Sequence, residues 1–342
     1  MLAARLANRM RHLDKWGRRQ GISCFRLYER DIPDQPIVID WFADEDAASP
    51  SDAGHAVAWF HGRTRDETPD EDAAWRAAAT QEILDGLDLS ADRLFVKQRG
   101  RQRTGDGQRK QYERLEAEGR TKVVREHDVR FEINLSDYLD VGLFLDHRPT
   151  RLSVQQRCRG KRVLNLFAYT GAFSVHARAG GAAATTTVDL SRTYLDWYAR
   201  NLDLNGWALD ADHVSIAADC LQWLEHAGDD PAHAGAYDIV ICDPPTFSNS
   251  KRMAADSFAI DRDHPELIRQ VARLVAPGGE IFFSTNLRSF DLDEAALPSG
   301  YGVKEISRRS VPEDFRNRRI HRCWRFAEGW QERRPPRERT AE

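Results

Sequence analysis

The chain has 342 residues, 41% of them hydrophobic and 30% charged, which fits a folded globular protein of about two domains and excludes disorder over the whole length. Fifty Lys and Arg residues against 54 Asp and Glu residues leave a formal net charge of −4. A basic surface over the whole molecule is thereby excluded, and any site for a polyanion must come from local clusters.

No apolar run approaches the roughly 18 residues that a membrane span needs. The five cysteines are widely scattered, and none belongs to a CxxC pair or to a Cys/His group at metal-ligand spacing. We therefore expect a reduced, cytoplasmic protein with no membrane partner, no disulfide framework and no metal. The cysteines are Cys24, Cys158, Cys220, Cys242 and Cys323.

The first twenty residues combine a basic character with a helical pattern. Their apolar residues recur at helical spacing, at Leu2, Leu6, Met10, Leu13 and Trp16, and glycines at positions 17 and 21 offer stop signals. The basic residues are Arg5, Arg9, Arg11, Lys15, Arg18 and Arg19. Such residues also occur in transit peptides, but the first helix of a folded domain is the simpler interpretation.

Residues 1–122 predict a small α+β domain. Two short apolar runs around a proline-containing turn predict a hairpin, and a strand, a helix and a further strand follow after an acidic stretch. The expected strands are residues 24–28, 37–42, 56–60 and 93–97, and the expected helix is 72–87.

A basic, glycine-containing segment at 97–125 carries a local excess of six positive charges. An exposed loop of this composition can follow a phosphate backbone and release its counterions, so we expect RNA contacts here. The candidates are Arg99, Arg101, Arg103, Arg109 and Lys110. A loop that only improves solubility is the alternative.

From residue 123 to 330, strands alternate with helices, which predicts an α/β domain with a mainly parallel, doubly wound sheet, Rossmann-like in form. The low-complexity tail 331–342 is expected to be disordered. After two strands near 123–135, the series is strand 162–167, helix from 172, strand 186–189, helix 193–204, strand 214–217, helix 221–226, strand 238–242, helix 266–275 and strand 280–285.

Ligands bind beyond the carboxyl ends of the strands in such sheets, so the polar residues at the strand ends are the candidates for a site. Strand one ends in NLFAYTG, residues 165–171, where a glycine allows close approach of the backbone. Strand two ends in Asp189, where an acid can accept hydrogen bonds from both ribose hydroxyls of a nucleoside cofactor.

The next two strands end in similar polar elements. Strand three is followed by Asp219 and Cys220, which suit an adenine edge. Strand four ends in DPPTF, residues 243–247, a rigid turn that brings a carboxylate and an aromatic ring together. Each element alone is explained by helix caps or a stiff loop. Their order in one chain predicts a nucleoside cofactor, and the missing GxGxxG disfavours NAD.

These motifs resemble those of class I methyltransferases, in which the same three elements surround S-adenosylmethionine (SAM) and the acceptor base. Longer stretches resemble the C-terminal, 7-methylguanosine-forming half of the bifunctional bacterial large-subunit (23S) ribosomal RNA methyltransferases. The resemblance covers roughly residues 5–327, without the other half and its RNA-binding module. The stretches are CFRLYERDIPDQPIVID, SDYLDVGLFLDHR, VLNLFAYTGAFSVHA, TTTVDLSRTYLDW, DPPTFSNSKRM and FRNRRIHRCW.

The resemblance implies a SAM site. LFLDHR, residues 143–148, would form a flap against the cofactor, although Arg148 has a salt bridge as its alternative role and Phe144 has core packing. Asn165 departs from the acid common at this position. The implied cofactor-binding residues are Asp146, Arg148, Asn165, Phe167, Tyr169, Thr170, Gly171, Asp189, Leu190, Ser191, Asp219, Cys220 and Asp243.

The resemblance also implies methyl transfer to guanine N7 of large-subunit ribosomal RNA, with Asp243, Pro244 and Phe247 as catalytic residues. N7 already presents a lone pair, so no general base and no covalent intermediate are needed. Asp243 would counter the charge on the methylated base and Phe247 would stack on it.

Two alternatives remain open. A 5-methylcytosine methyltransferase shares the fold but needs a cysteine nucleophile, which the related cytosine family carries in a Ser-Cys-Ser element. The matching stretch here is Ser284-Thr285-Asn286, and Cys242 falls inside an expected strand. A non-catalytic RNA-binding or ribosome-assembly factor is the second alternative, and the intact Asp189, Asp219 and Asp243 set argues against it.

Overall fold

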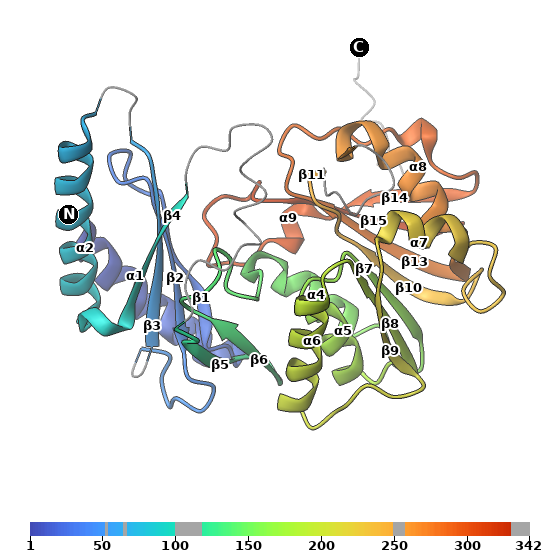
Figure 1. Cartoon of the computed structure of the whole chain (residues 1–342), viewed down its shortest axis with the longest axis horizontal. Coiled ribbons are helices and arrows are strands. Elements are labelled where there is room, and N and C mark those ends of the chain that lie inside the picture. Colours follow the sequence, from blue (N-terminus) through green and yellow to red (C-terminus); the bar gives the residue numbers. More distant parts are fainter. Residues whose placement is uncertain (52–53, 64–66, 100–117, 249–256, 330–342) are drawn as a thin grey trace, which may run out of the picture. The chain divides into compact units, whose positions relative to one another are not determined.

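The computed structural model describes residues 1–342 except 52–53, 64–66, 100–117, 249–256 and 330–342 (Figure 1). Its contacts divide the chain into two compact units. Unit 1 consists of Met1–Pro149, Asp196–Ala208 and Val311–Arg318, and unit 2 consists of Thr150–Leu195, Leu209–Ser310 and Arg319–Glu342. Among the described residues, no helix combines the length and the apolarity that a membrane crossing requires.

Unit 1 contains two long helices, a four-stranded sheet of order β1-β2-β3-β4 and a separate hairpin, β5-β6. The sheet is antiparallel except for the parallel pair β3 and β4. The elements are α1 (Leu2–Gln20), β1 (Cys24–Glu29), β2 (Ile37–Ala43), β3 (Gly54–His61), α2 (Pro69–Leu87), η1 (Ala91–Arg93), β4 (Leu94–Arg99), β5 (Thr121–Glu126), β6 (Val129–Asn134) and η2 (Leu145–His147).

The two faces of this sheet differ because side chains alternate along each strand. One face belongs to an apolar core shared with α1 and α2, in which Trp41 of β2 and Phe60 of β3 are buried with Leu6 of the first helix. The opposite face carries a buried ion pair, Arg26 with Asp40, at 2.6 Å.

Helix α1 ends and helix α2 begins at recognisable signals. Gly21 adopts the left-handed conformation, with φ of 68°, and its N–H donates to carbonyls in the last turn of α1. Thr68 and Glu71 form a capping box at the start of α2, and Pro69 occupies its first position. These signals fix the helix boundaries in a unit that the sequence correctly predicts as α+β.

Unit 2 is built on a mixed seven-stranded sheet of order β14-β15-β13-β10-β7-β8-β9 (Figure 1). Helices α4 and α6 have residues in both units. The elements are α4 (Arg148–Gln155), β7 (Arg162–Leu166), α5 (Ala172–Ala179), β8 (Ala184–Asp189), α6 (Arg192–Leu204), β9 (His213–Ala217), α7 (Cys220–Ala227), β10 (Tyr237–Cys242), β11 (Phe247–Ser248), β12 (Phe258–Ala259), α8 (Ile260–Ala272), β13 (Val275–Thr285), η3 (Glu294–Ala296), β14 (Tyr301–Glu305), α9 (Ser307–Ser310) and β15 (Arg322–Glu328).

Five adjacent strands of this sheet, β13, β10, β7, β8 and β9, run parallel. The last two strands add an antiparallel edge, because β15 pairs antiparallel with both β13 and β14. This arrangement confirms the expected Rossmann-like α/β sheet. The antiparallel edge was not expected. The motif FRNRRIHRCW ends inside β15, and Trp324 and Phe326 of this strand are buried in the core.

The two units do not coincide with the expected domains 1–122 and 123–330. The structure places residues 123–149 in unit 1, together with two short segments from later in the chain. The position of the domain boundary stays a prediction, and the tail 331–342 lies outside the described residues.

Candidate active site

The order of the strands in unit 2 contains a reversal next to β7. From β7 the chain adds β8 and β9 on one side, and it then returns to place β10 on the other side. These four strands are parallel, so their carboxyl ends meet at one edge of the sheet. Ligands of open α/β sheets bind at such a reversal, so the residues that follow these strands are the candidates.

The turn after β7 has an uncommon backbone. Phe167, Tyr169 and Gly171 are all in the left-handed region, with φ of 54°, 52° and 70°, a conformation that costs a non-glycine residue free energy. Two hydrogen bonds hold the turn. The Phe167 N–H donates to Cys220 Sγ at 3.2 Å, and the Tyr169 N–H donates to Asp189 Oδ2 at 2.8 Å. The ends of β7, β8 and β9 are thus joined.

This turn leads directly into helix α5. Gly171 precedes the first helical residue, and Thr170 beside it is completely buried. The first N–H groups of a helix have no acceptor within it and carry the positive end of the helix dipole. The start of α5 therefore presents backbone donors at the edge where the strand ends meet, beside a turn whose Phe167, Ala168, Tyr169 and Gly171 N–H groups donate within the protein.

Asp189 ends β8 and accepts two backbone hydrogen bonds. Its Oδ2 accepts from Tyr169, and its Oδ1 accepts from the Ser191 N–H at 2.8 Å. Burial raises the pKa of Asp189 to about 6, against the lowering effect of these two bonds. Leu190 and Ser191 complete the link into α6, whose Tyr194 N–H bonds the Ser191 carbonyl. The carboxylate is held by two backbone donors, and its pKa is well above the ordinary value.

Asp219, at the end of β9, has one carboxylate oxygen that accepts a hydrogen bond and one that does not. Its Oδ1 accepts the Leu221 N–H at 2.9 Å and so caps helix α7. Its Oδ2 is buried and has no hydrogen-bond partner among the described residues. A buried carboxylate oxygen without a donor is costly. The site thus contains an acceptor that a ligand donor would satisfy.

Asn165 lies in β7 beneath the turn and is buried. Its side-chain amide donates to Ser174 Oγ at 3.0 Å, and the Thr187 hydroxyl donates to the same oxygen at 2.8 Å. All three side chains are buried, so this polar group joins β7, α5 and β8 inside the core. Ser174 and Thr187 were not among the expected site residues, and Asn165 donates to Ser174 in this structure.

The DPPTF element follows β10. Asp243 Oδ1 accepts a hydrogen bond from the Ser284 hydroxyl at 2.6 Å, and Ser284 is buried in the neighbouring strand β13. Pro244 is buried, whereas Phe247 is 38% exposed. The element therefore combines an oriented carboxylate with an aromatic ring that reaches solvent. Ser284 was not among the expected site residues.

An aromatic pair flanks the same edge of the sheet. Tyr169 of the turn and Tyr194 of α6 meet edge to face, with their ring centroids 4.5 Å apart. Tyr194 lies within the stretch TTTVDLSRTYLDW but was not among the expected site residues. Its place follows from the start of α6 immediately after Asp189.

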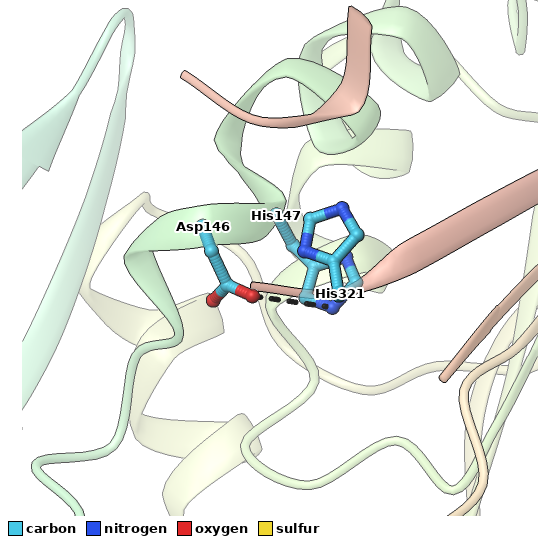
Figure 2. Close-up of side chains that lie close together, drawn as sticks. All are labelled: Asp146, His147 and His321. Atoms are coloured by element: carbon cyan, nitrogen blue, oxygen red, sulfur yellow. Dashed lines mark ion pairs between the residues drawn. The ribbon is translucent and has the colours of Figure 1, made fainter. Parts of the chain in front are cut away.

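Asp146 and Arg148, expected in the flap, belong to unit 1. Figure 2 shows the Asp146 carboxylate beside the imidazole of His147, with Oδ2 and Nε2 3.9 Å apart. Phe144 is partly exposed between buried Leu143 and Leu145, so it is not a core residue.

Arg148 is the centre of a buried ion-pair group within unit 1. Its guanidinium lies 3.3 Å from Glu126 and 3.1 Å from Asp314, and it donates to the Cys24 carbonyl at 2.7 Å. All of these residues are buried. The pKa of Asp314 is raised, since burial outweighs the attraction of Arg148. The contacts of Arg148 are those of a structural salt bridge, and its contact with the cofactor stays a prediction.

All five cysteines of the chain are buried. Burial raises the pKa of Cys220 and of Cys242 well above the ordinary range. A nucleophilic cysteine needs an accessible thiolate. The cysteines of this chain are therefore packing residues in the described structure.

The expected RNA contacts cannot be placed. Arg101, Arg103, Arg109 and Lys110 lie outside the described residues, and of Arg99 only the backbone is described, at the end of β4. Their role stays a prediction.

Comparison with known proteins gives consistent matches. The sequence profile of S-adenosylmethionine-dependent methyltransferases matches residues 65–318. A ribosomal RNA large subunit methyltransferase K/L from Methylococcus capsulatus is 46% identical over 331 residues, which are 95% of this chain and 42% of that protein. A ribosomal RNA large subunit methyltransferase K from Neisseria meningitidis serogroup B is 43% identical over 323 residues, 94% of this chain and 85% of that protein.

The chain spans 42% of the length of the K/L relative, and 85% of the K relative. A solved structure of a SAM-dependent methyltransferase from Streptococcus mutans has the same fold, with a TM-score of 0.69 at 21% identity over 95% of this chain and 80% of that chain. These matches confirm the resemblance seen in the sequence motifs. The chain belongs to the family of S-adenosylmethionine-dependent methyltransferases.

Proposed function

We propose that this chain transfers the methyl group of SAM to N7 of a guanine in large-subunit ribosomal RNA. The observation that carries the choice of base is that every cysteine is buried. The end of β10 offers instead an oriented carboxylate, Asp243, and an exposed aromatic residue, Phe247. The choice of substrate is supported by the names of the two relatives, which share more than 40% of their aligned residues with this chain.

The strand-end residues fit an adenosyl cofactor. Asp189 is the acceptor for the two ribose hydroxyls, and the unengaged oxygen of Asp219 is the acceptor for the adenine amine. The backbone donors at the start of α5 face the rest of the cofactor. Leu190, Ser191 and Cys220 shape the same pocket wall.

The sulfonium of bound SAM supplies an electrophilic methyl group. Guanine N7 carries a lone pair outside the Watson–Crick edge, so the protein has no proton to remove before transfer. Catalysis then consists of holding the two reacting atoms in line at about 3 Å, an effect that can lower the barrier by about 7–11 kcal/mol.

Asp243 and Phe247 act on the base. Methylation at N7 gives the guanine a positive charge, which the Asp243 carboxylate stabilises as it develops. The exposed Phe247 ring stacks on the extruded base. Pro244 keeps the turn rigid and supplies no competing N–H donor.

The contributions outside unit 2 belong to the same proposal. The segment 97–125 contacts phosphates through Arg99, Arg101, Arg103, Arg109 and Lys110, and Asp146 and Arg148 contribute to cofactor binding. The enzyme works in the cytoplasm, where ribosomal subunits assemble.

The second candidate, a 5-methylcytosine enzyme, is disfavoured because Thr285 is completely buried at the position of its nucleophile.

RNA that contains 5-fluorocytosine separates the two chemistries. A cysteine enzyme becomes covalently trapped on this base after methyl transfer, whereas an N7 enzyme does not. We expect no adduct on a denaturing gel, and we expect Asp243→Asn to bind SAM normally while its turnover falls. An adduct that disappears in Cys242→Ser would show that the base is cytosine.

A further inference from the structure

Helix α1 of unit 1 carries positive charge that the fold itself does not use. Arg5 pairs with Asp31 at 3.0 Å, and Arg18 pairs with Asp14 at 3.2 Å. By contrast, the structure shows no ion pair with any described residue for three other exposed cations, Arg11, Lys15 and Arg19, of which Arg11 bonds only Asn8 and the Ala7 carbonyl.

These three cations form one row, which we call the α1 stripe. Positions 11, 15 and 19 are four residues apart, so they lie within an arc of about 80° and about 6 Å apart along the axis. The opposite side of the helix holds Leu6 and Leu13, both completely buried in the core of unit 1. The α1 stripe therefore faces solvent.

The neighbouring helix α2 has the opposite charge. Its acids outnumber its single Arg76, which itself pairs with Asp72 at 2.6 Å. The α2 acids include Glu82, which accepts the backbone N–H groups of Leu2 and Ala3 at the start of α1. Of these two helices, α1 carries most of the positive charge. A polyanion should therefore bind to α1 in preference to α2.

An anionic membrane is a poorer match than RNA. A basic helix that binds a membrane surface inserts its apolar face between the lipids. The apolar face of α1 is committed to the core, since Leu2, Leu6, Leu13 and Trp16 are buried there. Only the row of cations is available, and a row of cations is complementary to a phosphate backbone.

We propose that the α1 stripe binds the phosphate backbone of the RNA substrate. The proposal rests on the proposed RNA substrate. It assigns a function to a helix that the sequence pattern explains only as the start of the domain. The contacts are non-specific in sequence and serve to hold the RNA while a base is selected elsewhere.

The test compares two triple variants of the full chain. Arg11→Gln, Lys15→Gln and Arg19→Gln together remove the α1 stripe, and glutamine preserves helix propensity. The control replaces Arg262, Arg269 and Arg273 of the α8 region by glutamine, three exposed arginines that each pair with an acid. Both variants lose three charges. The probe is a large-subunit ribosomal RNA transcript, and its dissociation constant is measured between 0.05 and 0.5 M salt (about one decade in concentration).

We expect the α1 variant to bind the transcript on the order of tenfold to hundredfold more weakly at 0.1 M salt and to lower the salt slope by about 2 to 3. SAM affinity should be unchanged in both variants, and the control should keep the slope of the native protein. If the salt slope is unchanged in the α1 variant while the native protein still methylates RNA, the α1 stripe does not bind RNA. This result would overturn the proposal for α1 and leave the proposed function intact.

Two other results are equally decisive. A native protein that methylates no RNA would contradict the proposed function instead. Binding to phosphatidylglycerol vesicles that requires the α1 stripe, together with unaltered RNA binding, would assign this surface to a membrane.

Discussion

The affinity for SAM should fall as the pH drops through about 6, because Asp189 holds the ribose only as a carboxylate. Burial raises the pKa of this side chain from its ordinary value of 3.8 to about 6. A carboxyl group is mostly protonated and uncharged below its pKa. The affinity for SAM should therefore be lost as the pH falls below about 6. From pH 7 to pH 5 the dissociation constant should rise by about tenfold. An aspartate with the ordinary pKa would leave it nearly constant.

Isothermal titration calorimetry with SAM between pH 5 and pH 8 measures this effect. Asp189→Asn is the matched control, since it cannot ionise. It should bind SAM more weakly by about 1–3 kcal/mol at pH 7, and it should show no step near pH 6. If SAM itself gains or loses a proton in this pH range, the effect is the same for the native protein and for Asp189→Asn. A native affinity that stays constant down to pH 5 would contradict the raised pKa of Asp189, and an Asp189→Asn protein that binds SAM as tightly as the native protein at pH 7 would refute the ribose assignment.

Three further predictions follow from the same geometry. Asp219→Ala removes the unengaged acceptor and should weaken SAM binding by about 1–3 kcal/mol in calorimetry; equal affinity would exclude the adenine contact. Ser284→Ala removes the hydroxyl that orients Asp243 and should lower turnover with SAM affinity unchanged, whereas Ser284→Thr should retain activity; equal turnover in all three proteins would contradict the orienting role. Arg148→Ala leaves buried carboxylates unpaired and should lower the free energy of unfolding by about 3–5 kcal/mol in urea denaturation, and a shift below about 1 kcal/mol would show that these acids are already neutral.

Local patterns in the sequence were sufficient to predict most elements of the fold. The apolar spacing of the first helix, its glycine stop and the βα alternation of unit 2 each reflect local chemistry. The strand-end acids Asp189, Asp219 and Asp243 could be found for the same reason, because each follows a segment that the sequence predicts to be a strand. All three lie at the ends of parallel strands in the structure.

Contacts between residues far apart in the chain could not be predicted. Ser284 meets Asp243 only through the register of β10 and β13, which places Cys242 beside Phe283. The partners of Arg148 come from β5 and from residue 314. No local pattern encodes such pairings, because they depend on which strands and segments become neighbours.

The backbone of the cofactor turn shows the same limit. Gly171 signals a left-handed position by its residue type, whereas Phe167 and Tyr169 adopt that conformation because tertiary hydrogen bonds hold them. The antiparallel pair β14 and β15 was also missed, since its short strands lie among charged residues.

The central claim is tested most directly by the identity of the methylated nucleoside. The purified chain is incubated with SAM and large-subunit ribosomal RNA from a strain that lacks the gene, and the RNA is digested to nucleosides for mass spectrometry. We expect one additional methyl group, recovered as 7-methylguanosine and in a smaller amount with Asp243→Asn at equal time. Recovery of the methyl group in 5-methylcytidine, or no transfer to this RNA by a protein that binds SAM, would contradict the proposed activity.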